Sequence, residues 1–175
     1  FETGDSGPLG STDVSGITYH PSGHLYLADS SVNDPGESGN NIFATSRSGD
    51  SVDREIASGN SSLTGITFNA FDGYFYVTDN TDSKSVTRYD SNLDDPRFEF
   101  APQDDVPNAS DPAGITSDPT TGKLYVADGS AGGLQVLTYS LDLSNSVEAT
   151  RDVSFEGAFS VTNQMDSLEG IAFHQ

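Results

Sequence analysis

One phrase occurs three times in this sequence, and the repeat restricts the fold more than any other feature. Each copy contains Gly-Ile-Thr and, after a turn, an aromatic and apolar segment that ends in Asp. The repeat glycines are Gly16, Gly65 and Gly114, and a fourth copy, which begins at Glu169, adds Gly170, so the spacings are 49, 49 and 56 residues. Repeats of this length with strand character are typical of β-propeller blades.

Each copy predicts four antiparallel strands, of which the first two form a hairpin around a glycine-containing turn. These hairpins pair Ser15–Tyr19 with Leu25–Asp29, Thr64–Phe68 with Phe75–Asp79, and Ala113–Thr116 with Leu124–Asp128. Third strands are predicted at 41–47, 85–90 and 134–140, and weaker fourth strands at 52–57, 97–101 and 149–155. The first strands are apolar on both sides, so we expect neighbouring sheets to bury both of their faces.

The predicted fold class is all-β, an arc of a propeller with three four-stranded blades. The blades lie near residues 11–60, 61–109 and 110–165, and partial blades at 1–10 and 166–175 flank them in this single propeller domain or part of one. Three blades do not close a ring, because propellers have roughly four to eight. We therefore expect either the remainder of a longer chain or a second copy to complete it.

The charge excludes several classes of partner. Only 7 Lys and Arg accompany 27 Asp and Glu, for a net charge of −20. Nucleic-acid phosphates and anionic lipid surfaces would repel such a chain. No apolar run approaches the ~20 residues of a spanning helix, so no membrane insertion is expected. The acidic composition rich in Ser, Thr and Asn favours a secreted or cell-surface protein, although salt-adapted cytoplasmic proteins share this balance.

The repeats also resemble a known family. Gly-Ile-Thr, then Pro-Ser-Gly or Thr-Thr-Gly, then Leu-Tyr-Val-Ala-Asp is similar to the repeats of the NHL and gluconolactonase-like propellers, usually six-bladed, and of the SdiA-regulated group. The resemblance covers nearly the whole chain and implies the propeller fold. It leaves the activity open, because these propellers include binding scaffolds, lactonases and other hydrolases.

Four acidic positions stand out against the repeat. Asp29, Asp79 and Asp128 end the second strand of every copy, so we interpret them as structural caps of the following turns. Glu169 breaks the pattern, because Ser, Thr and Ala precede the repeat glycine in the other copies. In gluconolactonase-like propellers a Glu-Gly pair at this point holds a divalent metal at the mouth of the channel. The resemblance thus makes Glu169 a candidate metal ligand.

Two other features suggest metal ions. Loops 29–34 and 79–82 concentrate the hard oxygen ligands that calcium requires, and they make Asp29, Asp34, Asp79 and Asp82 candidate Ca²⁺ ligands; solvated loops are the alternative. His20 and His24 flank the first turn and could pinch a metal. Because neither histidine recurs in the other copies, we interpret both as surface turn residues.

The leading hypothesis is a non-catalytic extracellular module for binding or structure, stabilised by calcium and belonging to a larger surface or adhesin-like protein. Its protein or glycan ligand would bind the loops at the channel end. The alternative is a metal-dependent hydrolase of the lactonase or phosphoesterase kind, with Glu169 in its central channel. A third reading is a self-assembling subunit. The sequence singles out no catalytic residue and no organic cofactor.

Overall fold

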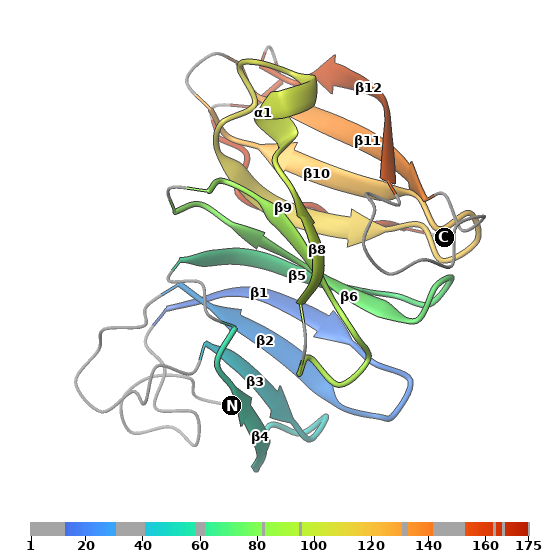
Figure 1. Cartoon of the computed structure of the whole chain (residues 1–175). Coiled ribbons are helices and arrows are strands. Elements are labelled where there is room, and N and C mark those ends of the chain that lie inside the picture. The colour runs from blue at the N-terminus through green and yellow to red at the C-terminus, as the bar shows by residue number, and fades with distance from the viewer. Residues whose placement is uncertain are drawn as a thin grey trace.

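The computed structural model describes residues 13–30, 41–58, 62–81, 83–94, 96–130, 133–141, 153–162, 164–165 and 167–174. These residues form three antiparallel sheets of four strands each and one short helix. Figure 1 shows the sheets side by side in chain order, from the blue sheet to the orange one, as consecutive members of an arc. The predicted all-β class and its four-stranded units are confirmed.

Each sheet is a meander in which consecutive strands pair. The first contains β1 (Val14–Tyr19), β2 (Leu25–Asp29), β3 (Ile42–Thr45) and β4 (Val52–Ile56). The second contains β5 (Leu63–Asn69), β6 (Tyr74–Asp79), β7 (Val86–Tyr89) and β8 (Pro96–Phe100). After helix α1 (Pro102–Asp105), the third contains β9 (Pro112–Ser117), β10 (Leu124–Asp128), β11 (Gln135–Leu141) and β12 (Val153–Ser160).

The predicted fourth strand of the last sheet was misplaced. It was expected at 149–155, whereas β12 runs to Ser160, and residues 149–152 lie outside the described part of the chain. The pairing continues along the whole of β11, from Leu141 opposite Val153 to Gln135 opposite Ser160. Glu156-Gly157-Ala158 has low strand propensity, so the sequence ended the strand too early.

Glycines close the three first hairpins in the same way. Gly23, Gly73 and Gly122 have φ angles of +98°, +80° and +75°, which other residues rarely adopt. Each of these hairpins also shifts register near its repeat glycine, as between Val14 and Gly16 in the first sheet. Turn chemistry visible in the sequence therefore fixes the local pairing.

Apolar clusters fill both interfaces of the middle sheet. Alternate residues of β6 point to opposite sides, so Phe75 and Val77 pack toward the first sheet and Tyr76 packs toward the third. Both faces of β5 and β6 are largely buried, as predicted. In β1 the prediction was wrong, because Ile17 and Tyr19 are 56% and 48% exposed.

No helix of the described residues combines the length and the apolar character needed to cross a membrane. The one helix has four residues and lies beside the third sheet, at the top of Figure 1.

Candidate functional site: the concave face of the arc

Four glycines bring the innermost strands into backbone contact. A Cβ atom on Gly16 would lie 2.8 Å from the Gly65 Cα, and one on Gly65 would lie 2.9 Å from the Gly114 Cα. A Cβ on Gly114 would lie 3.0 Å from the Gly170 Cα. Side chains cannot be accommodated at Gly16, Gly65 and Gly114, whereas a Cβ on Gly170 would meet nothing within 4 Å. The first three glycines therefore set the spacing of β1, β5, β9 and the segment 168–173.

Hydroxyl groups beside the glycines tie one sheet to the next. The Ser15 Oγ donates to the carbonyl of Leu63 at 2.6 Å, and the Thr64 Oγ1 donates to the carbonyl of Pro112. Ala113 occupies the corresponding place in the third sheet and has no hydroxyl to donate. The position before the repeat glycine therefore serves packing between sheets in the first two copies.

Residues 168–173 continue the series of first strands. The backbone N–H of Phe173 donates to the Thr116 Oγ1 at 3.2 Å, as the N–H of Phe68 donates to the Thr18 Oγ1 at 3.0 Å. Leu168 is buried and packs with apolar residues of the third sheet. The segment occupies the place of the innermost strand of a fourth sheet.

An acidic cleft opens at one end of these strands, and we call it the acidic mouth. Its volume is about 530 Å³, and Asp13, Asp111 and Glu169 line it together with Ser30, Asn80 and Ser167. The Asn80 Nδ2 donates to the Asp111 Oδ1. Among the described residues that line this cleft there is no Lys or Arg. The cleft is thus arranged to attract a positive charge.

The opposite end of the same strands is aromatic. A cleft of about 460 Å³ lies there, lined by Tyr19, Phe68, Phe173, Pro21 and Pro119 with several hydroxyls, and no described residue of its lining is charged. Between the two ends lies an aliphatic stretch that includes one isoleucine of each copy: Ile17, Ile66, Ile115 and Ile171. The concave face therefore changes from acidic to aromatic along its length.

Comparisons with solved structures decide what kind of arc this is. The chain is similar to a protein in the crystal structure of a nidogen/laminin complex, with 18% identity and a TM-score of 0.61 over 85% of this chain and 50% of that one. It is also similar to a protein in the crystal structure of a mitotic checkpoint complex, with 7% identity and a TM-score of 0.61 over 92% and 44%. The fold is that of a β-propeller.

A third neighbour is Sqt1 of Saccharomyces cerevisiae, with 11% identity and a TM-score of 0.57 over 88% of this chain and 37% of that one. The chain thus spans half or less of these structures. No protein-family model and no curated protein matches the sequence. At these identities the comparisons establish the propeller fold, and each sheet is a blade.

The three recurring aspartates are fully buried and do not line the acidic mouth themselves, although the residue after each one, Ser30, Asn80 or Gly129, does. In the third blade Asp128 accepts hydrogen bonds from the backbone N–H of Asp111 at 2.9 Å, the Ser130 Oγ at 2.9 Å and the Gln135 Nε2 at 2.8 Å. In the second blade the Asp79 Oδ1 accepts the Thr81 N–H at 2.6 Å, and its Oδ2 is buried with no hydrogen-bond partner within the described part of the chain.

The structure describes some of the candidate metal ligands and not others. Asp29 and Asp79 end the second strands of different blades, and Asp34 and Asp82 lie outside the described residues. In the described ranges no three side chains of His, Cys, Asp or Glu converge to hold an ion. Glu169 is exposed and lines the acidic mouth.

Sequence reasoning missed two residues of the acidic mouth. Asp13 and Asp111 each stand three residues before a repeat glycine, where Ser62 and Ser167 stand in the other copies. A carboxylate at this place in two copies is therefore visible when the copies of the repeat are compared. That both lie beside Glu169 depended on the packing of the blades.

The first residue of each hairpin turn caps that turn. The Asn69 Oδ1 and the Asp118 Oδ1 accept backbone N–H groups two residues ahead, at 3.0 and 2.8 Å. In the first blade the His20 Nδ1 takes this role and accepts the N–H of Ser22 at 3.1 Å. The imidazole thus replaces the side-chain oxygen of the other two turns.

His20 is also part of the packing between the first two blades. Its ring centroid lies 4.3 Å from that of Phe68, 5.4 Å from Phe75 and 5.7 Å from Tyr26. Burial, with a smaller contribution from His24, lowers the pKa of His20. The interpretation of His20 as a surface turn residue was wrong in this respect, because the turn folds back onto the aromatic cluster of the interface.

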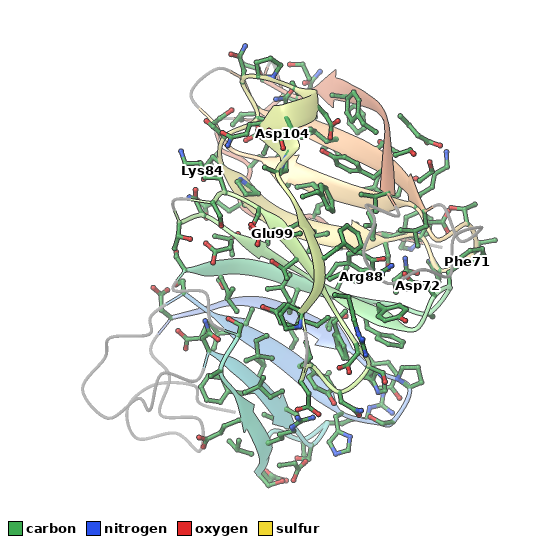
Figure 2. The ribbon with its side chains drawn as sticks, viewed as in Figure 1. Phe71, Asp72, Lys84, Arg88, Glu99 and Asp104 are labelled. Carbon is green, nitrogen blue, oxygen red and sulfur yellow. The ribbon has the colours of Figure 1, made fainter. Side chains whose placement is uncertain are left out.

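A polar group of the second blade lies on the face that packs toward the third blade. The Arg88 guanidinium lies 4.6 Å from the ring centroid of Tyr74 and 4.4 Å from that of Phe98. The Tyr76 hydroxyl donates to the Asp72 Oδ2 at 2.6 Å, and burial raises the pKa of both groups. Figure 2 shows Asp72 beside Arg88, and charge attraction links them.

Proposed function

We propose that this chain is a non-catalytic protein-binding module whose acidic mouth receives a Lys- or Arg-bearing segment of a partner protein. The observation that carries the proposal is the convergence of Asp13, Asp111 and Glu169 on one cleft, without a basic side chain among the described residues of its lining. Cationic side chains complement such a surface, and they favour both encounter and register.

The comparisons support a binding role. Two of the propeller neighbours were solved in protein complexes, the nidogen/laminin complex and the mitotic checkpoint complex. Those partners belong to those proteins. For this chain, the two complexes support a role in binding proteins in general. The acidic mouth supports a partner that carries a cationic segment.

The proposal includes completion of the ring by further blades of a longer chain. Residues 168–173 already stand where the first strand of a fourth blade belongs, and Phe173 stacks on Tyr125 at 6.2 Å. Phe159 on the same face of the third blade is 54% exposed, although apolar residues fill this face in the blades that have neighbours. The repeat motifs support a ring of the NHL and gluconolactonase-like kind, with the blade boundaries predicted above.

Calcium and location belong to the same proposal. Carboxylates at the acidic mouth and in the loops after β2 and β6 are ligands that Ca²⁺ prefers. The acidic composition, rich in Ser, Thr and Asn, supports a secreted or cell-surface protein. An effect of Ca²⁺ on the thermal unfolding midpoint, reversed by a chelator and reduced by Glu169→Gln, would support an ion at the mouth. An effect unchanged by Glu169→Gln would point to the loops.

The binding proposal is tested by neutralising the mouth. A triple variant, Asp13→Asn, Asp111→Asn and Glu169→Gln, is compared with a control of equal charge, Asp50→Asn, Asp104→Asn and Glu99→Gln, whose positions are exposed and lie outside the clefts. Figure 2 labels Glu99 and Asp104. The probe is a tetralysine peptide, and its binding is measured by NMR titration at two salt concentrations.

We expect the mouth variant to lose most of the binding and the control to lose little. Equal losses in both variants would show that the net charge attracts the peptide without a site, and would overturn the proposal. The metal-dependent hydrolase alternative uses the same cleft. Hydrolysis of a simple lactone that requires a divalent ion and disappears in the mouth variant would favour that alternative.

A further inference from the structure

The turn between β1 and β2 holds two imidazoles against one hydroxyl. The His20 Nδ1 lies 2.8 Å from the Ser22 Oγ, and the His24 Nδ1 lies 2.9 Å from the same oxygen. The corresponding turns begin and end with Asn69 and Tyr74 in the second blade, and with Asp118 and Lys123 in the third. The paired imidazoles are therefore specific to the first blade.

The hydrogen bonds show that the His20 Nδ1 carries a lone pair and no proton, and that the Ser22 backbone N–H now occupies this lone pair. The Ser22 backbone N–H donates to the His20 Nδ1 at 3.1 Å, so this nitrogen is an acceptor and its proton is on Nε2. A neutral imidazole nitrogen with a lone pair is a ligand for transition metals. The Ser22 hydroxyl lies between this nitrogen and the His24 Nδ1, and its single hydrogen can be donated to only one of them.

Further contacts hold both imidazole rings in place. The His24 Nε2 lies 3.3 Å from the Asp53 Oδ2, the arrangement by which a carboxylate orients a metal-binding histidine through its other nitrogen. His20 packs against Phe68 and Phe75 of the second blade. The turn between them is closed by the hydrogen bond from the Gly23 N–H to the His20 carbonyl. The rings are thus largely ordered before an ion binds, and binding replaces the hydrogen bond from the Ser22 N–H to the His20 Nδ1.

We propose that the His20 Nδ1 and the His24 Nδ1 bind one divalent transition-metal ion, such as Zn²⁺ or Cu²⁺, in the place now taken by the Ser22 hydroxyl. Ser22 is exposed, so its hydroxyl can rotate away while the nitrogens close to the ~2.0–2.1 Å of a metal–imidazole bond. Since no third ligand of the His, Cys, Asp or Glu type converges there among the described residues, water completes the coordination.

This site is distinct from the acidic mouth in place and in chemistry. It lies at the other end of β1, and its nitrogen ligands select Zn²⁺ or Cu²⁺ over Ca²⁺. Failure of either proposal therefore leaves the other standing.

The residues at the same turn positions of the second blade are used as the test substitutions. His20→Asn copies Asn69 and keeps a side chain that can cap the turn, and His24→Tyr copies Tyr74. Tag-free protein is titrated with Zn²⁺ by calorimetry and with Cu²⁺ by visible absorption. We expect one ion per chain, and a loss of more than about tenfold in affinity for each variant, because even an outer carboxylate contributes 10–100-fold. Asp53→Asn should lose about tenfold.

Ser22→Ala and His174→Gln are the controls. Removing the competing hydroxyl should leave zinc affinity unchanged or increase it, and His174 is not a ligand, so its loss should have no effect. Equal affinity in wild type, His20→Asn and His24→Tyr would overturn the proposal, as would equal competition by Ca²⁺. If a variant does not fold, NMR of the wild-type chain tests the proposal in its place. One zinc ion bound by both turn histidines must shift the signals of both together.

Discussion

The two interfaces between the blades share their backbone contacts and differ in their side chains. In each, a glycine of one first strand meets the next at backbone distance, and a hydroxyl donates across to a carbonyl. The first interface is then filled by aromatic and aliphatic side chains around His20. The second contains the buried Arg88 and Tyr76 and the half-buried Asp72.

This difference separates geometry from energetics. The repeated contacts place each blade at the same spacing, which is why the glycine and the hydroxyl recur. The side chains that do not recur determine how strongly each pair of blades holds together and whether pH affects it. A change at a repeated position should therefore affect assembly of the arc, and a change at a unique position should affect one interface.

The largest effect is expected for Gly65→Ala. Its Cβ would lie 2.9 Å from both the Gly114 Cα and the Thr78 Oγ1, so β5 and β9 must move apart. We expect a loss of about 3 kcal/mol or more in the free energy of unfolding, measured in urea. The control is Gly157→Ala, whose Cβ meets nothing within 4 Å and should change stability by less than about 0.5 kcal/mol. Similar losses in both would show that the close approach is not limiting.

Arg88→Met tests the second interface alone. It removes the stacking on Tyr74 and Phe98 and leaves Asp72 without its cationic neighbour, so we expect a loss of about 2–3 kcal/mol. Arg54→Met is the matched control at the first interface, because Arg54 forms an exposed pair with Asp94 that is worth less than about 1 kcal/mol. Urea unfolding of both variants checks this, and an equal cost would mean that burial adds nothing.

The hydroxyl bonds should contribute less. Thr64→Val keeps the shape of the side chain but leaves the Pro112 carbonyl without its donor, and it should cost about 1 kcal/mol. Ala113→Ser supplies the hydroxyl that the third blade lacks, and should stabilise by up to about 1 kcal/mol. Thermal and urea unfolding measure both changes. A loss for Ala113→Ser would show that the segment 168–173 does not receive the bond.

The smallest effect concerns pH. Burial raises the pKa of Asp72 above its ordinary value of 3.8, so the folded chain binds this proton more tightly than the unfolded chain does. The contribution of Asp72 to stability is therefore complete below that ordinary value and is lost as the pH rises through the folded pKa. The Asp72→Asn variant has no titrating group at this position, so it does not show this loss of stability with rising pH. Unfolding free energies of both proteins from about pH 3.5 to 7 should diverge in that direction, whereas a constant difference would contradict the assignment.

Much of the fold could be predicted because its signals are local. Alternating apolar residues and the left-handed glycines Gly23, Gly73 and Gly122 specify each hairpin within about fifteen residues of sequence. The end of β12 could not be predicted, because pairing with β11 overrides the weak propensity of Glu156-Gly157-Ala158. Glu169 was predicted by its departure from the repeat, whereas Asp13 and Asp111 became candidates only when the blades were placed side by side.

The sequence by itself determined the repeat, the strands and the turns, since these depend on residues close together in the chain. Tertiary structure decided which side chains meet, because the same turn position carries His20, Asn69 or Asp118 and only packing distinguishes their surroundings. It placed His20 among aromatic rings and brought carboxylates from distant copies into one cleft. Burial and charge are sums over neighbours from several blades, and such sums exist only once the blades are assembled.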